Sequence, residues 1–307
     1  MNPTPGISVI IPTHNRAALL RECVASVFRQ TWVDWEMIIV DDASRDETAR
    51  VIESVADDRV RSVRNDTPAN AAAARNQGAR LAAGDILTFL DDDDLYLPEK
   101  LERTWHAFQT NAESGVVVSG FDTGALVVSV DWHGDVAGKL AKRFYTLPTS
   151  ILAVRASVFD RLGGFDDTMT PSEDFEFCIR ASRVTKFQSL PQPLVFHRQH
   201  SGPRLIDNRM LTEASFTRMV TKNFGDGRGG IGPRGRRLLC SWKGQGHAGR
   251  ARVSFANGDR RGAQEHSRAA LWCEPLNIRR WLQWGLYRVF PSGSWFARWY
   301  RRARVRL

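Results

Sequence analysis

Apolar runs and amphipathic stretches alternate along the first third of the chain. Four short apolar runs predict buried strands, at residues 7–11, 37–40, 60–63 and 86–90. Three stretches with apolar positions at helical spacing predict helices, at residues 17–28, 46–55 and 69–83. Strands separated by helices of this length form right-handed crossovers, which give a mostly parallel sheet with both faces covered. The pattern therefore predicts an α/β domain of the nucleotide-binding type.

Beyond residue 98 the pattern is less regular, and it changes again near residue 225. Two further helices are predicted, at residues 98–110 and ending near residue 183, with short strands at residues 116–119, 126–130, 150–154 and 194–196. The Gly-rich residues 225–235 are typical of a linker. We therefore predict a main domain over residues 1–224 and a basic helical region over residues 236–307. Within that region, residues 250–271 have the pattern of one tetratricopeptide-like helical hairpin.

The composition is typical of a soluble globular protein. Of its 307 residues 42% are hydrophobic and 25% are charged, and no apolar run approaches the length of a membrane span, which is about 18 residues. The first six residues lack the basic start and apolar core of a signal peptide, so we expect a cytoplasmic location. The four cysteines lie far apart without a C-x-x-C pair, and we interpret them as free, packed thiols.

The formal net charge of +9 comes from the C-terminal quarter of the chain. Residues 228–307 hold 18 Lys and Arg against 3 Asp and Glu, whereas residues 1–227 hold 25 against 31. Within residues 276–307, Trp and aliphatic residues recur at helical spacing among eight arginines. This pattern favours a helix that lies on an anionic membrane surface. The alternatives are packing of its apolar face on the preceding hairpin and, with no recognisable module to support it, nucleic-acid binding; we predict no nucleic-acid partner.

Polar residues follow three of the predicted strands at the points where these end. They are Pro12, Thr13, Asn15 and Arg16 after the first strand, Asp41, Asp42 and Ser44 after the second, and Asp91, Asp92, Asp93 and Asp94 after the fourth. In an open α/β sheet, ligands bind beyond the carboxyl ends of the strands. These residues are therefore candidates for a binding site, although Asp, Asn and Ser also favour turns and helix caps.

The four consecutive aspartates carry the strongest chemical signal. In extended backbone Asp91 and Asp93 project to the same face, with Cα atoms about 7 Å apart. Two carboxylates in a cleft repel each other unless a cation lies between them, and Mn²⁺ or Mg²⁺ completed by phosphate oxygens fits such a pair. No Gly-rich phosphate loop follows the first strand, so basic side chains are needed for the phosphates, with Arg16, Arg64 and Arg75 as candidates.

The order of these motifs resembles that of the family 2 glycosyltransferases. The resemblance covers about residues 5–205, and its later part is Gly163-Gly164-Phe165-Asp166 followed by Ser172-Glu173-Asp174. The earlier parts are Ser8 to Arg16, Ile39 to Ser44 with Asp46 and Thr48, Ala74 to Gly78, and Gly84-Asp85 leading into Phe89 to Asp94. The resemblance implies a GT-A fold and an inverting, metal-dependent transfer from a nucleotide-diphosphate sugar.

The resemblance also implies a role for individual residues. Asp91 and Asp93 match the D-x-D element that holds the metal on the pyrophosphate, in a register that four consecutive aspartates leave open by one position. Asp174 matches the general base, with Glu173 as a second catalytic candidate. Arg198 and His200 are candidate pyrophosphate contacts, whereas His14 departs from the aromatic residue common there. The implied nucleotide-binding residues are Pro12, Thr13, Asn15, Arg16, Asp41, Asp42, Arg75 and Asp92, with Asp42 assigned to the base.

These observations favour a glycosyltransferase of cell-surface polysaccharide synthesis that acts at the inner face of the cell membrane. The donor would be a nucleotide-diphosphate sugar, with a UDP-sugar favoured, and the acceptor a hydroxyl of a saccharide or lipid-linked molecule. The residue types are those that such a transfer needs. A cation held by carboxylates stabilises the leaving phosphate, and a further carboxylate can deprotonate the attacking hydroxyl. The alternatives are a sugar-phosphate nucleotidyltransferase, which would want a Lys-bearing phosphate loop, and a non-catalytic sugar-nucleotide-binding membrane scaffold, which would have lost its acids.

Overall fold

The structure is a computed structural model in which the chain forms two compact units. It describes residues 5–142, 148–169, 171–198, 209–227, 230–256, 259–273 and 284. Unit 1 comprises Met1–Gly138 and Tyr145–Met219, and unit 2 comprises Lys139–Phe144 and Val220–Leu307. The domain limits expected from the sequence, at residues 224 and 236, stay a prediction.

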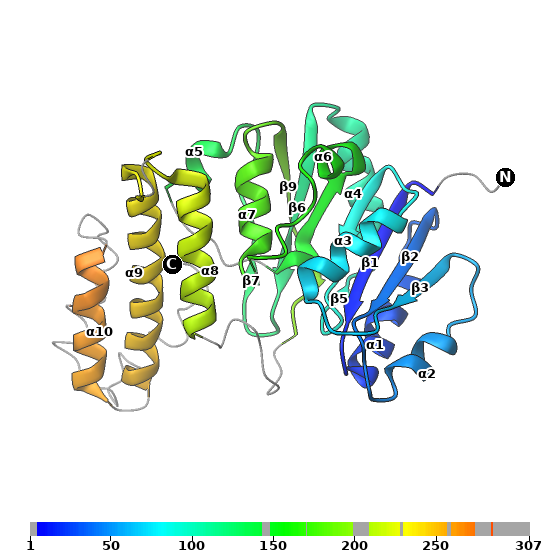
Figure 1. The fold of residues 1–307 in the computed structure, drawn as a ribbon, viewed down its shortest axis with the longest axis horizontal. Helices are drawn as coiled ribbons and strands as arrows, with labels where there is room; N and C mark the ends of the chain where they lie inside the picture. Colours follow the sequence, from blue (N-terminus) through cyan, green and yellow to red (C-terminus); the bar gives the residue numbers. More distant parts are fainter. Residues whose placement is uncertain are drawn as a thin grey trace. The chain divides into compact units, whose positions relative to one another are not determined.

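Unit 1 is built on a mixed sheet in which the described strands follow the order β3-β2-β1-β4-β8-β6-β9-β5, with β7 beside β6 (Figure 1). The strands are β1 (Ile7–Thr13), β2 (Trp35–Asp41), β3 (Val60–Arg64), β4 (Ile86–Phe89), β5 (Leu95–Tyr96), β6 (Ser114–Asp122), β7 (Val127–Val128), β8 (Leu152–Arg155) and β9 (Lys186–Phe196). The first four strands are mutually parallel, and β9 is parallel to β6, whereas β8 and β5 run antiparallel to their neighbours. The mostly parallel α/β sheet expected from the sequence is therefore confirmed.

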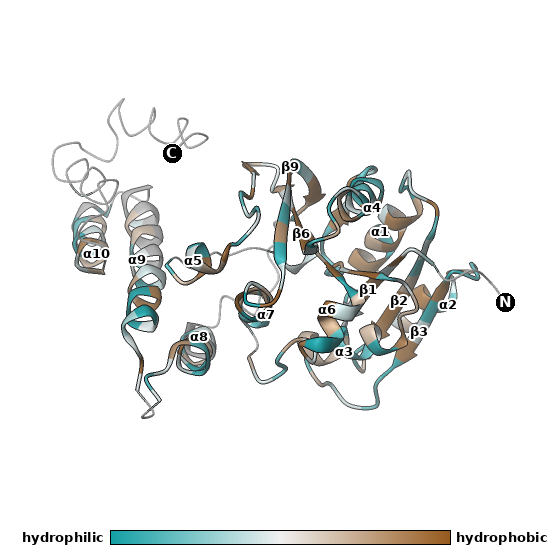
Figure 2. Ribbon diagram, turned by 90° about the horizontal axis from the view of Figure 1, so that it is seen from above, coloured by the Kyte–Doolittle hydropathy of each residue, from teal (hydrophilic) through white to brown (hydrophobic). Residues whose placement is uncertain are grey.

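Helices cover both faces of this sheet, as Figure 2 shows for α1 and α4 on one side and α3 and α6 on the other. The helices of unit 1 are α1 (Ala17–Phe28), α2 (Thr48–Glu53), α3 (Ala71–Leu81), α4 (Lys100–Thr110), α6 (Ala156–Arg161), α7 (Glu173–Ala181) and the 3-10 turn η1 (Thr149–Ile151). Strands β1 and β2 are buried along their whole length. Because both faces are covered, these strands read as continuous apolar runs.

The close approach of α3 to the sheet depends on Gly78. A Cβ at this position would lie 2.5 Å from a methyl group of Ile10 on β1. Only glycine lets the helix backbone come this near to the strand. Arg75 and Asn76 precede Gly78 by three and two residues on α3. The close contact at Gly78 therefore also sets how far these two residues lie from the sheet.

The structure corrects three details of the expected elements. Pro12 lies within β1 and does not stop it, because β4 pairs only as far as Ile10 and a missing N–H costs no bond on that side. The two-residue strand β5 was not expected. Strand β9 begins at Lys186, well before the apolar residues 194–196 from which it was predicted.

Unit 2 contains two packed helices, α9 (Pro233–Ala256) and α10 (Arg260–Cys273). Helix α8 (Arg209–Phe224) precedes them and crosses the division between the units. Helix α9 ends at Ala256 and α10 begins at Arg260, on either side of the residues where the two predicted helices were expected to meet. However, α9 begins at Pro233, so it is longer than expected and includes residues 233–235 of the predicted linker. In the described part of the chain, no helix is long and apolar enough to span a bilayer. Residues 276–307, the predicted membrane-binding segment, lie outside the described residues apart from Trp284.

Lys100, at the start of α4, is fully buried beside the sheet. Its ammonium donates to Ser119 Oγ at 3.2 Å and to the carbonyl oxygen of Ile151 at 3.1 Å. Burial lowers the pKa of Lys100 from 10.5 to about 7. The folded protein therefore binds this proton less tightly than the unfolded chain does.

We expect this lysine to make the protein more stable as the pH rises from 7 toward 10. In that range the unfolded state holds more protons, so Lys100 contributes a positive slope of up to about 1.4 kcal/mol per pH unit to the free energy of unfolding. Lys100→Met removes the titrating group and should flatten the slope measured by urea denaturation. Lys186→Met, at an exposed position, is the control and should keep the slope of the wild type. Equal slopes in wild type and Lys100→Met would contradict the expectation.

Candidate active site

The carboxyl ends of β1 and β4 bring the first polar cluster together. Thr13 Oγ1 donates to Asp92 Oδ2 at 2.7 Å. The Arg16 guanidinium lies 3.2 Å from Asp92 Oδ1 and 2.5 Å from Asp93 Oδ2. Burial raises the pKa of Asp92 to about 7, against the opposing effects of Arg16 and the Thr13 hydrogen bond. Residues separated by almost eighty positions in the sequence thus share one site, as the parallel order of the strands predicts.

The four aspartates do not form the extended segment expected from the sequence. The amide of Asp94 donates to the carbonyl oxygen of Asp91 at 2.9 Å, which closes a turn. The expectation that Asp91 and Asp93 share a face by strand alternation is therefore wrong. Their carboxylates instead pair with different arginines, Asp91 with Arg75 and Asp93 with Arg16.

Asp41 and Asp42, at the end of β2, are both buried and face different partners. Asp42 accepts hydrogen bonds from Asn65 Nδ2 at 2.8 Å and from the amide of Ala69 at 2.9 Å. Asp41 accepts from the amide of Ser44 at 2.9 Å, and its second oxygen lies 3.4 Å from the Arg64 guanidinium. That oxygen has no hydrogen bond within the described part of the chain. The atom is buried, and the Arg64 guanidinium is the charged group beside it.

Two loop residues beside these carboxylates have left-handed backbone. Asn15 has φ 54°, and its side-chain oxygen accepts from the amide of Arg45 at 2.7 Å. Ala43, between the two aspartates and Ser44, has φ 60°. Such conformations cost non-glycine residues about 1–2 kcal/mol. Both strained residues lie in the loops that follow β1 and β2, so the backbone is bent where the candidate nucleotide-binding residues lie.

Arg75 connects the aspartate turn to α7. Its guanidinium, in a residue only 4% exposed, lies 2.5 Å from Asp91 Oδ1 and 2.7 Å from Glu173 Oε1. Burial alone would lower the pKa of Arg75, but these two carboxylates outweigh it and raise the pKa further. The sequence suggested Arg75 as a phosphate contact. In the structure its guanidinium is buried and pairs with two acids, and its contact with the donor stays a prediction.

Aromatic packing and an amide clamp fix the N-terminus of α7. Phe177 packs on Phe159 and Phe165, with ring centroids 5.3 Å and 5.1 Å apart. The side-chain amide of Asn76 on α3 donates to the Phe165 carbonyl at 2.8 Å and accepts from its amide at 2.9 Å. Ser172, just before the helix, has φ 117°. The segment that carries both candidate catalytic acids is therefore rigidly held.

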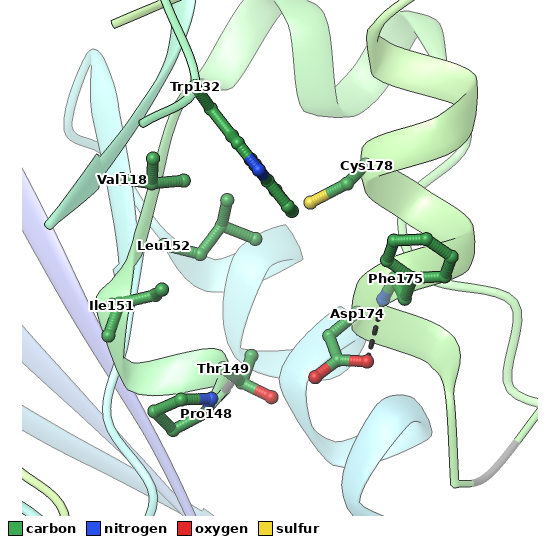
Figure 3. A pocket seen from close by; sticks show the side chains of 9 residues that line it. All are labelled: Val118, Trp132, Pro148, Thr149, Ile151, Leu152, Asp174, Phe175 and Cys178. Carbon is green, nitrogen blue, oxygen red and sulfur yellow. Dashed lines mark hydrogen bonds between the residues drawn. The ribbon is translucent and has the colours of Figure 1, made fainter. Parts of the chain in front are cut away.

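Glu173 and Asp174 have different surroundings although they are neighbours. Glu173 is 6% exposed and uses both oxygens, one for Arg75 and one for the amide of Ser172 at 3.0 Å. Asp174 is half-buried and accepts from the amide of Phe175 at 2.6 Å. Its carboxylate lines a small pocket with Trp132, Thr149 and Cys178 (Figure 3). Burial, followed by the charge of Glu173, raises the pKa of Asp174 to about 7.

The last aspartate of the run, Asp94, connects three distant segments. It is fully buried and accepts from Ser150 Oγ at 2.6 Å, and His197 Nδ1 lies 3.0 Å from its other oxygen. The amide of Arg198 donates to that second oxygen at 3.2 Å, while the Arg198 guanidinium pairs with Glu22. Sequence reasoning missed Ser150, for which no motif gave a signal. His200, the other candidate pyrophosphate contact, lies outside the described residues.

Comparisons with known proteins identify the family. Residues 8–161, half of the chain, match the model of glycosyl transferase family 2. An uncharacterized glycosyltransferase of Haemophilus influenzae is 30% identical over 206 residues, which cover 64% of this chain and 69% of the relative. The chain belongs to glycosyl transferase family 2. The resemblance stated from the sequence is therefore confirmed, and the enzyme class is that of a glycosyltransferase.

Other relatives of this family 2 glycosyltransferase match shorter segments. Escherichia coli WfgD, named a UDP-Glc:α-D-GlcNAc-diphosphoundecaprenol β-1,3-glucosyltransferase, is 34% identical over 96 residues. These cover 31% of this chain and 38% of WfgD. The family relationship extends to enzymes of polysaccharide biosynthesis.

Two solved structures share the fold of this glycosyltransferase. A fragment of S. aureus TarS, residues 1–349, in complex with UDP-GlcNAc has a TM-score of 0.64 at 15% identity, covering 92% of this chain and 91% of that fragment. The mannosyltransferase PcManGT of Pyrobaculum calidifontis, in complex with GDP-Man and Mn²⁺, has a TM-score of 0.58 at 18% identity, covering 99% and 82%. The GT-A fold expected from the sequence is confirmed.

The aspartate turn of this glycosyltransferase has the donor atoms that a divalent metal on a diphosphate needs. Among the described residues no three His, Cys, Asp or Glu side chains are grouped as a cation cage. However, Mg²⁺ and Mn²⁺ bind nucleotides with one or two carboxylates plus phosphate oxygens, and need no such cage. Asp91 and Asp93 provide two hard oxygen ligands in one turn, each now balanced by an arginine. The donor set therefore fits a metal that arrives with a diphosphate.

Proposed function

We propose that this glycosyltransferase transfers a sugar from a nucleotide-diphosphate sugar to an acceptor hydroxyl in a single displacement that inverts the anomeric carbon. The observation that carries the proposal is the position of Asp174. It is the half-buried acid next to Glu173, which Arg75 connects to Asp91 on the aspartate turn. Arg75 thus joins the start of α7, where Asp174 lies, to the turn after β4 that would bind the diphosphate. We propose a UDP-sugar as the first donor to test.

On the donor side, the residues after β1, β2 and β4 would hold the nucleotide. Asp42 and Asp41 would face the base and ribose, and their position at the carboxyl end of β2 supports this role. Asp91 and Asp93 would hold Mn²⁺ or Mg²⁺, which supplies positive charge to the departing diphosphate. The further residues proposed to line the donor site are Pro12, Thr13, Asn15, Arg16, Arg75 and Asp92.

On the acceptor side, Asp174 would accept the proton of the attacking hydroxyl. A base works best when its pKa lies near the operating pH, and the pKa of Asp174 is about 7. Glu173, also a catalytic candidate from the sequence, has both oxygens engaged and would hold Arg75 in place instead. The oxygen–carbon bond to the sugar forms as the bond to the diphosphate breaks, and the proton leaves on Asp174.

The relatives support the donor class and suggest the acceptor. TarS is solved with UDP-GlcNAc and WfgD is named for UDP-Glc. WfgD is also named for a diphosphoundecaprenol-linked acceptor. We therefore propose a saccharide or lipid-linked acceptor in cell-surface polysaccharide synthesis.

The proposal is tested by nucleotide binding and turnover. Calorimetry with UDP, GDP and their glucose, N-acetylglucosamine and mannose conjugates should give binding with Mn²⁺ or Mg²⁺, and much weaker binding after EDTA. The matching sugar nucleotide should be hydrolysed slowly even without acceptor. Binding without any turnover would favour the scaffold alternative, and consumption of sugar 1-phosphate with a nucleoside triphosphate would favour the nucleotidyltransferase.

We further propose that residues 276–307 hold the enzyme on the inner face of the membrane. The support is their charge, with eight arginines and no acidic residue, since each basic residue near an anionic surface contributes about 1 kcal/mol. Deletion of this segment should move the protein from the pellet to the supernatant when it is sedimented with phosphatidylglycerol vesicles. Pure phosphatidylcholine vesicles are the control and should retain little of either protein. Equal sedimentation of both proteins would show that the segment does not bind lipid.

A further inference from the structure

The pocket beside Asp174 is small and its walls are mostly apolar. Figure 3 shows Val118, Ile151, Leu152 and Trp132 facing the Asp174 carboxylate and Cys178 on α7. Val118 is 1% exposed, and Ile151, Leu152 and Trp132 are 2% exposed each. The free volume within is about 20 Å³. This is room for one water-sized or methyl-sized group.

The walls of the recess are mostly apolar, which suits a methyl group. The polar side chains that line it are the Asp174 carboxylate, the Thr149 hydroxyl and the weakly polar Cys178 thiol. The remaining walls are hydrocarbon and aromatic ring. An apolar group that enters the recess loses contact with water, which is favourable.

The position of the recess assigns it to the acceptor and not to the donor. None of the carboxylates proposed to hold the nucleotide or the metal lines it. Its walls come from β6, η1, β8, α7 and the segment around Trp132. A hydroxyl that gives its proton to Asp174 therefore brings its neighbouring substituent to the recess.

We propose that this recess is a methyl-binding subsite that selects acceptors with a methyl group next to the attacking hydroxyl. The inference rests on the proposed function, because it takes Asp174 as the base. Two kinds of sugar carry such a methyl group, an N-acetyl amino sugar and a 6-deoxy sugar. Burial of one methyl group increases affinity several-fold. The difference in affinity between acceptors with and without that methyl group is therefore measurable.

The test compares acceptors that differ by one methyl group, in the presence of diamagnetic Mg²⁺ and UDP or GDP. One pair is the methyl β-glycosides of N-acetylglucosamine and N-formylglucosamine, and the other is methyl α-L-rhamnoside and methyl α-L-lyxopyranoside, which lacks C6. In one of the pairs, the methyl-bearing sugar should bind about fivefold tighter in titrations followed by saturation-transfer NMR. Its methyl protons should receive the strongest saturation. The pair that responds identifies the kind of sugar.

Two variants of Val118 change the recess in opposite directions. Val118→Ile fills it with one methyl group and should remove the preference. Val118→Ala enlarges it and should move the preference toward the longer homologue, N-propionylglucosamine or the rhamnoside analogue with an ethyl group on C5. Val117→Ile is the matched control, because Val117 is equally buried but lies on the other face of β6 and does not line the recess. It should bind like the wild type.

Nucleotide binding separates the two ways in which this experiment can fail. If UDP and GDP bind with Mg²⁺ but neither pair shows a methyl preference, the subsite does not exist. The same conclusion follows if a preference is found and is unchanged in Val118→Ile and Val118→Ala. If neither nucleotide binds to the wild type, the proposed function itself is wrong.

Discussion

Replacing Asp174 with asparagine should reduce sugar transfer by about 10²–10⁴-fold, the range expected when a positioned general base is lost. Asparagine keeps the size of the side chain and can still accept the hydrogen bond from the Phe175 amide. It cannot take up the proton of the acceptor hydroxyl. Nucleotide binding should remain near that of the wild type, because Asp174 is not among the residues proposed to hold the donor. Turnover and calorimetry on the same preparation measure the two effects.

The pH dependence of transfer gives a second measure of the same role. The carboxylate must be unprotonated to act as a base, and its pKa is about 7. In the wild type, kcat/KM should therefore rise as the pH increases through about 7 and then level off. Asp160→Asn, at an exposed position on α6, is the control and should keep both the rate and the pH profile. Loss of nucleotide binding with unchanged turnover in Asp174→Asn would refute the catalytic role.

The sequence predicted the site best where it depends on local pattern. The apolar runs locate β1, β2 and β4, and parallel strands end at one edge, so the polar residues at these strand ends were expected to lie in one site, where Thr13 contacts Asp92. Helix α1 has the predicted bounds for the same reason, since its apolar positions repeat at helical spacing. Such features need no knowledge of distant residues.

Features decided by distant partners could not be predicted from the sequence. The turn at residues 91–94 is anchored by Asp94, whose partners Ser150 and His197 are 56 and 103 positions away. The extended geometry assumed for Asp91 and Asp93 failed because these contacts are not visible in the local pattern. The separate roles of Glu173 and Asp174 likewise depend on Arg75, 98 positions before Glu173. Only burial and pairing distinguish these two adjacent acids.

Replacing Arg75 with methionine should cost about 3–5 kcal/mol of folding free energy, the usual loss when one member of a buried ion pair is removed. Asp91 and Glu173 would lose the cation that lies 2.5 Å and 2.7 Å away, and Asp174 would lose a charge that lowers its pKa. Urea denaturation measures the loss of stability. In the folded variant, the increase of kcat/KM with pH should move to higher pH than in the wild type.

A double-mutant cycle with Glu173→Gln distinguishes this bridge from ordinary packing. If Arg75 is needed mainly to balance the acids, removal of one of the charges should make its loss less harmful. The double variant should then be more stable than the sum of the two single changes predicts, by about 0.5–3 kcal/mol. Arg75→Lys keeps the charge but not the two-pronged contact, so its stability should fall between those of wild type and Arg75→Met. Additive effects in the cycle would mean that Arg75 acts by filling space, and that the link from the aspartate turn to α7 is not electrostatic.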